Sequence, residues 1–178
     1  MPKSPTISMN KQYSDFGDIL FVYWKIYGGG YAIVRSPYFH IALVAAALSY
    51  PLWWNSSDWA TLILGAIPNI LGFSIGAFAI ILSFGQSALD RMKDPDEARS
   101  RYLSVITSFV HFIIAQSLSL IVAFIGKGWN FKVLGFVGTV LGIYAIALAV
   151  AAAFRLFRLA RVYNQLRVQD TKAETEAD

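Results

Sequence analysis

Cysteine is absent from the 178-residue chain, which excludes disulfide bonds and thiolate metal sites. Charged residues are also scarce: they make up 15% of the chain, whereas a soluble domain usually has about 25%. The charges are clustered, and the apolar runs between them approach or exceed the roughly 20 residues that cross a bilayer. This pattern predicts an integral membrane protein.

Acidic residues are missing from these apolar runs, and the chain has only two histidines. Catalysis or ion-coupled transport within a membrane generally requires carboxylates, metal ligands or nucleophiles at helical spacing. The motifs HExxH and Gly-x-Ser-x-Gly and the phosphate-binding P-loop are absent too. We therefore expect neither an enzyme nor a bound metal or cofactor.

Four apolar runs predict membrane-spanning helices, at about 36–54, 59–86, 102–125 and 132–154. The predicted fold is a single all-α domain, a membrane four-helix bundle. Its second helix is expected to continue to about Met92 and its third to begin near Pro95. The fourth is expected to continue as a cytoplasmic helix over 155–169, followed by a disordered tail at 170–178.

Residues 14–27, "SDFGDILFVYWKIY", are too short to span, but their apolar residues recur at helical spacing. They predict an amphipathic helix at the inner leaflet, either a movable gating element or a static anchor. The glycines at 28–30 are expected to end this helix and to form a hinge.

Basic residues predict the orientation, because cytoplasmic loops of membrane proteins are enriched in Lys and Arg. Of the 15 basic residues, only Lys127 and Lys132 fall in the two predicted outer loops. Four of the five tryptophans, at 53, 54, 59 and 129, fall at the predicted outer boundary. Both termini are therefore expected in the cytoplasm, with the chain crossing a bacterial inner membrane several times.

The second predicted helix has a face of small and polar residues, although most lipid-facing helices are bulky. At about 100° per residue, its small positions from Gly65 to Ser83 fall within one arc. The sequence GFSIG within it is a GxxxG motif, which allows two helices to approach closely in lipid. Ser74 is on the opposite side and is expected to have no role. The candidates for pore lining or helix contact on this face are Asn69, Gly72, Gly76, Ser83 and Gln86.

The third helix has a more polar face, with candidates Ser104, Ser108 and His111. His111 is expected to face protein or water. It either bonds a neighbouring helix through Asn69, Ser83 or Gln116, or it lines a pore and senses pH. The fourth helix has a third small face, from Gly135 to Ala152. Three such faces exceed what a monomeric bundle requires, which favours self-association.

Two basic clusters are predicted at the cytoplasmic surface, and each either contacts anionic lipid or binds a phosphate-bearing ligand such as a nucleotide or oligonucleotide. Their candidate residues are Arg91, Lys93, Arg99, Arg101, Arg155, Arg158 and Arg161.

The stretch "PNILGFSIGAFAIILSFG", followed by "QSALDRMKDPDEARSRY", resembles the small four-helix membrane effectors of bacterial anti-phage defence. The Hailong-type channel effector is the most similar in layout, and the membrane subunit of Kiwa is second. This resemblance rests on topology over the whole chain, without a shared motif. It implies a homo-oligomer, often a tetramer, that acts with a cytosolic partner.

The sequence therefore predicts a homo-oligomeric channel-like effector that is gated from the cytoplasmic side by a phosphate-bearing signal or a partner protein. Opening would depolarise the membrane. The alternatives are a non-conducting sensor or scaffold that recruits a cytosolic partner through its basic face, and an accessory subunit of a larger complex.

Overall fold

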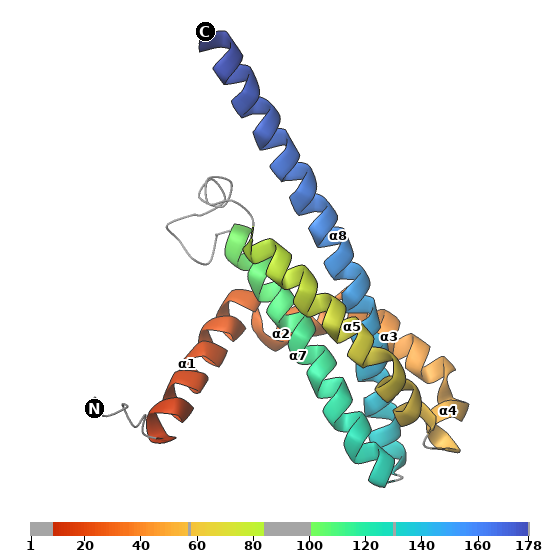
Figure 1. The fold of residues 1–178 in the computed structure, drawn as a ribbon. Helices are drawn as coiled ribbons and strands as arrows, with labels where there is room; N and C mark the ends of the chain where they lie inside the picture. Colours follow the sequence, from red (N-terminus) through yellow and green to blue (C-terminus); the bar gives the residue numbers. More distant parts are fainter. Residues whose placement is uncertain (1–8, 57, 84–100, 130, 178) are drawn as a thin grey trace, which may run out of the picture.

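The computed structural model describes residues 9–56, 58–83, 101–129 and 131–177, and every regular element in these ranges is an α-helix (Figure 1). The all-α prediction is confirmed for this part of the chain. The helices, in chain order, are α1 (Met9–Tyr27), α2 (Gly29–Val34), α3 (Pro37–Leu48), α4 (Tyr50–Trp54), α5 (Asp58–Leu82), α7 (Arg101–Gly128) and α8 (Lys132–Ala177).

Three of these helices contain segments long and apolar enough to cross a membrane: Asp58–Leu82, Leu103–Gly128 and Lys132–Arg161. At about 1.5 Å per residue, a 25-residue helix is roughly 37 Å long, more than the roughly 30 Å of the hydrocarbon core. They agree with the predicted second, third and fourth spans and indicate a membrane protein.

The first predicted span, 36–54, differs from this pattern because it is not one continuous helix. α3 has only 12 residues, about 18 Å, and Ser49 separates it from the five-residue α4. Pro51 explains the break, since it has no N–H and its ring collides with the carbonyl four residues earlier. The Trp53 indole N–H donates to the Ala46 carbonyl at 2.8 Å and so satisfies a backbone acceptor near the break. Three of the four predicted spans are therefore single long helices, and the segment of the first is divided between α3 and α4.

The predicted N-terminal helix is present and begins earlier than expected, at Met9. It ends at the predicted glycines, where Gly28 and Gly29 have φ values of +97° and +67° that favour glycine. The C-terminal end of α1 lies against α7, and α1 diverges from the bundle toward its own N-terminus (Figure 1). Apolar side chains away from this contact remain outward: Phe16 and Ile19 are 62% and 68% exposed.

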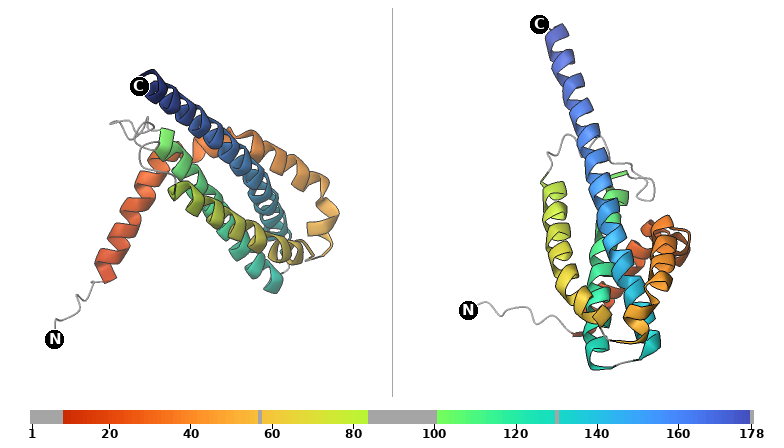
Figure 2. Two further views of the ribbon diagram at one scale, coloured as in Figure 1. Left: turned by 45° about the horizontal axis from the view of Figure 1, so that its top comes forward. Right: turned by 90° about the vertical axis from the view of Figure 1, so that its right-hand side faces the viewer.

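α8 is a single 46-residue helix that extends far beyond the other helices (Figures 1 and 2). This helix covers the stretch 155–169, where the sequence predicted a cytoplasmic helix, and continues through Ala177, into the stretch where it predicted a disordered tail. The predicted ends of the second and third helices, near Met92 and Pro95, lie outside the described residues.

The small residues of α8 face the interior and allow α5 to pack closely. The Trp59 indole occupies the space where a side chain at Gly138 would lie, and a Cβ at Gly142 would come within 2.7 Å of Ile63. The same indole also fills the space beside Gly126 of α7. Small residues at helix contacts let helices approach closely in this way. The third small face predicted from the sequence therefore serves packing within the chain; its buried members are Gly135, Gly138, Gly142, Ala145 and Ala152.

Candidate functional site

The small face of α5 points away from the rest of the chain. No other part of the described chain comes within 4 Å of the place that a Cβ would take at Gly65, Gly72 or Gly76. Among the described residues of this face, the polar side chains of Asn69 and Ser83 bond carbonyls of their own helix. Asn69 donates to the Gly65 carbonyl at 3.4 Å, and Ser83 donates to the Ile80 carbonyl at 2.7 Å. The exposed members of the face are Gly65, Asn69, Gly72, Gly76, Ala79 and Ser83.

The polar face of α7 is mostly buried within the chain. Ser108 and His111 are buried, whereas Ser104 is exposed. His111 is hydrogen-bonded on both ring nitrogens, with Nδ1 at 2.7 Å from the Tyr23 hydroxyl and Nε2 at 2.9 Å from the Tyr144 hydroxyl. These bonds join α1, α7 and α8. The expectation of a neighbouring-helix contact is confirmed for His111, but its partners are tyrosines rather than Asn69, Ser83 or Gln116.

Aromatic stacking completes what we call the His111 cluster: Tyr23, Tyr27, His111 and Tyr144. The Tyr27 ring stacks on the imidazole with centroids 4.0 Å apart and planes at 20°. Burial, together with the neighbouring Tyr27 phenol, raises the pKa of Tyr23 to about 12. Burial also raises the pKa of Tyr27. Both phenols are therefore neutral at physiological pH and can each donate and accept hydrogen bonds.

The basic residues of α8 fall into two kinds. The guanidinium of Arg155 donates to the Ser108 hydroxyl, which itself donates to the Ser104 carbonyl at 2.7 Å. Arg158 and Arg161 are exposed on the part of α8 that continues past this contact. Arg155 is therefore engaged within the chain, and the other two arginines are accessible to a partner. Arg101 is the first residue of α7. The candidates Gln86, Arg91, Lys93 and Arg99 lie outside the described residues.

A buried polar pair between α5 and α7 was missed by the reasoning from sequence. The Ser74 hydroxyl donates to the Ile70 carbonyl at 2.9 Å and accepts from Nε2 of Gln116 at 3.0 Å. Ser74 is fully buried, so the expectation that it has no role is wrong. A glutamine in the middle of a span requires an interhelical partner, which is the signal that could have identified this contact.

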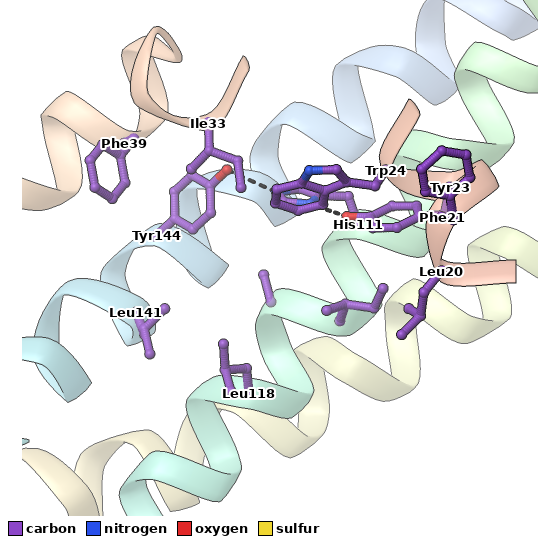
Figure 3. A pocket seen from close by; sticks show the side chains of 12 residues that line it. Leu20, Phe21, Tyr23, Trp24, Ile33, Phe39, His111, Leu118, Leu141 and Tyr144 are labelled. Atoms are coloured by element: carbon purple, nitrogen blue, oxygen red, sulfur yellow. Dashed lines mark hydrogen bonds between the residues drawn. The ribbon is translucent and has the colours of Figure 1, made fainter. Parts of the chain in front are cut away.

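An apolar cavity of about 620 Å³ lies beside the His111 cluster (Figure 3). Its wall includes α1, α2, α3, α7 and α8. None of the described lining residues is an aspartate, glutamate, lysine or arginine. They are Leu20, Phe21, Tyr23, Trp24, Ile33, Phe39, His111, Ile114, Ala115, Leu118, Leu141 and Tyr144.

These features define a helical membrane protein with one unused small face on α5 and a separate cavity beneath α1. None of the described residues that line the cavity belongs to α5, and Figure 2 shows the arrangement of the helices that form the two features. Comparison of the chain with protein-family models, curated proteins and solved structures finds no match. The functional proposals therefore rest on sequence patterns and on this geometry.

Proposed function

We propose that the protein is a homo-oligomeric, channel-like membrane effector in which α5 of each copy forms the contact between copies. The proposal rests above all on how the small faces are used. Within one chain, the small face of α8 and most of the polar face of α7 are buried. The small face of α5 is exposed in the described part of the chain. In the most apolar part of α5, 22% of the residues are buried within the chain. The corresponding share is 44% in α7 and in α8.

Physical chemistry favours another helix as the occupant of the α5 face. Lipid tails are as apolar as leucine, so helices associate in a bilayer through close packing and interhelical hydrogen bonds. Gly72 and Gly76 permit this packing, because no described atom of the same chain lies where a Cβ would be. Asn69 and Ser83 supply polar groups on the same face. A closed ring of copies, with four as the proposed number, would place these groups around a common axis.

Gating from the cytoplasmic side is the second part of this proposal. The basic clusters support this part of the proposal, because Arg158 and Arg161 of α8 are exposed. α8 itself projects beyond the other helices (Figure 1). A guanidinium group binds phosphate through paired hydrogen bonds, so a nucleotide or oligonucleotide is a suitable signal. A partner protein that contacts the same arginines is the other candidate. Both termini are placed in the cytoplasm in this proposal, which would make the membrane a bacterial inner membrane.

Native mass measurement in mild detergent tests the contact. Ala79→Ile adds bulk on the α5 small face, and Ala66→Ile adds the same bulk at an exposed position on another side of α5. We expect wild type and Ala66→Ile to form the same oligomer, and Ala79→Ile to shift toward the monomer. A wild-type protein that is monomeric in both detergent and nanodiscs would overturn self-association.

Ion flux from liposomes tests the conducting role separately. We expect flux only when the signal is present, using a panel of cyclic nucleotides and short oligonucleotides as probes. Asn69→Leu should alter flux, measured on the fraction that native mass measurement shows to keep the wild-type oligomer. Liposomes that stay sealed under every addition, while the oligomer is intact, would exclude the channel and leave the association standing.

The long projection of α8 supports a second candidate, a non-conducting scaffold that recruits a cytosolic protein. Charge reversal by Arg158→Glu and Arg161→Glu should then abolish capture of the partner, with conductance absent in wild type and variant alike. Lys132→Glu, at the opposite end of α8, is the matched control and should leave capture unchanged. Arg155 is omitted from this test because it bonds Ser108 within the bundle.

A further inference from the structure

Helix geometry gives the depth at which the first arginine of α8 lies in a membrane. The exposed aromatic residues Trp129 and Phe131, followed by Lys132, mark one membrane boundary. At about 1.5 Å per residue, Arg155 lies about 35 Å beyond Lys132 along the axis of α8. The hydrocarbon core is roughly 30 Å thick, and the headgroup regions bring the bilayer to about 40–45 Å. Arg155 therefore lies at the depth of the headgroups of the opposite leaflet, where the lipid phosphates are.

Arg158 is about one turn further along α8 and reaches the same level. The side chains of an α-helix tilt toward its N-terminus, which at this end of α8 is the direction of the membrane. Residues three apart on a helix are neighbours, with Cβ atoms about 5–6 Å apart. The guanidinium groups of Arg155 and Arg158 can therefore contact the same lipid headgroup.

A contact with α7 holds Arg155 and leaves it able to bind a second partner. Its guanidinium donates to the Ser108 hydroxyl. A guanidinium has five N–H donors, and Arg155 is still exposed, so donors remain for another group. No acidic residue occurs from Phe131 to Gln169 of the chain, and α3 and α7 contain none either. Two neighbouring cations with no acidic residue on these helices favour an anionic ligand, because phosphate pairs well with guanidinium groups.

Two exposed phenylalanines beside these arginines indicate that the anion belongs to a lipid. Phe154 and Phe157 are 67% and 71% exposed. At about 100° per residue, both fall on the same side of α8 as Arg158. Aromatic rings beside cationic groups are typical of the membrane interface, where the ring contacts acyl chains and the cation contacts the headgroup. A soluble phosphate would pair with the arginines but leave both rings in water, whereas a lipid covers both kinds of group.

We propose that Arg155 and Arg158 bind the phosphate of a net anionic phospholipid, with the rings of Phe154 and Phe157 against its acyl chains. The lipid belongs to the leaflet at this end of the bundle. The site takes up part of the basic surface of α8 and leaves Arg161, about 44 Å beyond Lys132, to the soluble signal of the proposed function. The bound lipid would fix the point at which α8 leaves the bilayer.

Lipid titration of the full-length protein in mild detergent, followed by native mass measurement, tests the site. We expect phosphatidylglycerol to bind severalfold more tightly than phosphatidylcholine with the same acyl chains. A basic residue near the membrane surface contributes about 1 kcal/mol toward anionic lipid, which corresponds to roughly fivefold in affinity. Arg155→Gln and Arg158→Gln should each reduce the preference by about this factor. Arg158→Gln decides the outcome if Arg155→Gln disturbs folding, since Arg158 takes no part in the contact with Ser108.

Arg161→Gln is the matched control, because it removes the same charge one turn beyond Arg158 and outside the depth of the headgroups. It should retain the preference for phosphatidylglycerol. Equal losses in all three variants would overturn the site, because they would show that only the overall charge attracts the lipid. A wild-type protein without any preference between the two lipids would overturn it as well.

Competition distinguishes a lipid from a soluble phosphate as the ligand. The probes are glycerophosphoglycerol, which is the same headgroup without acyl chains, and a nucleoside monophosphate. Neither should displace phosphatidylglycerol at equal concentration, because neither can cover Phe154 and Phe157. Displacement by either probe at equal concentration would overturn the assignment to a lipid and extend the site of the soluble signal to Arg155.

This proposal rests on the membrane insertion within the proposed function, but on neither self-association nor conduction. A monomeric, non-conducting protein that still prefers phosphatidylglycerol would refute the channel and keep the lipid site.

Discussion

The indole of Trp59 on α5 occupies the space in which a side chain at Gly138 on α8 would lie. Trp59 is 3% exposed, so it has no solvent or lipid side toward which to move. The absence of a side chain at position 138 is therefore a condition for the packing of α5 on α8.

The first prediction follows from this contact. Gly138→Ala forces a methyl group into the Trp59 ring, and overpacking of this kind costs about 1–3 kcal/mol. Unfolding in a denaturing detergent should therefore begin at a lower concentration. Gly17→Ala is the control, because no described atom beyond its own helix backbone lies within 4 Å of its Cβ position; its stability should equal or slightly exceed that of wild type. Equal stability of both variants would contradict the contact.

The second prediction concerns the buried pair of Ser74 and Gln116. Ser74→Ala removes the acceptor of the Gln116 amide, and interhelical hydrogen bonds in membranes average about 0.6 kcal/mol with a maximum near 1.7. A double-mutant cycle with Gln116→Leu should show a coupling in this range, measured from unfolding in denaturing detergent. Strict additivity of the two single changes would show that the pair contributes nothing.

The third prediction concerns how Tyr23 holds α1 and how that depends on pH. The pKa of Tyr23 is raised above its ordinary value of 10.0, so its folded state favours the neutral phenol. Its contribution to docking of α1 should be complete below about pH 10 and should disappear as the pH rises toward 12. Because the chain lacks cysteine, spin labels at Asp18→Cys and Ile121→Cys can report the distance from α1 to α7.

The same labels test the hydroxyl directly. Tyr23→Phe removes the bond to His111 and should broaden the distance distribution at neutral pH. Tyr13→Phe, at a position that is 72% exposed, should leave it unchanged. A distribution that is the same in all three proteins from pH 7 to 12 would show that α1 is held by packing alone.

The fourth prediction concerns the junction between α1 and α2. Gly28 has a φ of +97°, and left-handed backbone costs an L residue about 1–2 kcal/mol. Gly28→Ala should therefore change the direction of α1 and move the spin-label distance. Gly30→Ala is the matched control, because φ at Gly30 is not positive and its Cβ would make only an ordinary contact with Trp24 at 3.7 Å. An unchanged distance in Gly28→Ala would mean that the junction tolerates a side chain.

The long helices could be predicted from sequence because their signal is local. A run of apolar residues longer than a bilayer requires an internally hydrogen-bonded helix, whatever its neighbours are. α5, α7 and α8 follow this rule. The broken first span shows where the rule fails: its apolar run was long enough, but Pro51 removed a backbone donor and separated α3 from α4.

The same distinction between local and long-range information applies to the candidate residues. The inward position of His111 followed from the cost of a polar ring in lipid. Its partners, Tyr23 and Tyr144, come from helices 88 and 33 residues away along the chain. No periodicity within one helix contains that information, and neither tyrosine was a candidate. The cavity beneath α1 was missed for the same reason, since five separate helices form its wall.

Sequence was sufficient for composition, helix content and the existence of three faces of small or polar residues, because each of these depends on spacing within a single helix. It could not tell which face is used within the chain and which is left free. That depends on which helices meet. Trp59 and Ile63 of α5 pack against the glycines of α8. The polar face of α7 contacts Tyr144 and Arg155 of α8 through His111 and Ser108. Once those contacts are made, Trp59 and Ile63 are buried, and the glycines of α5 are left exposed beside bulky residues such as Phe73.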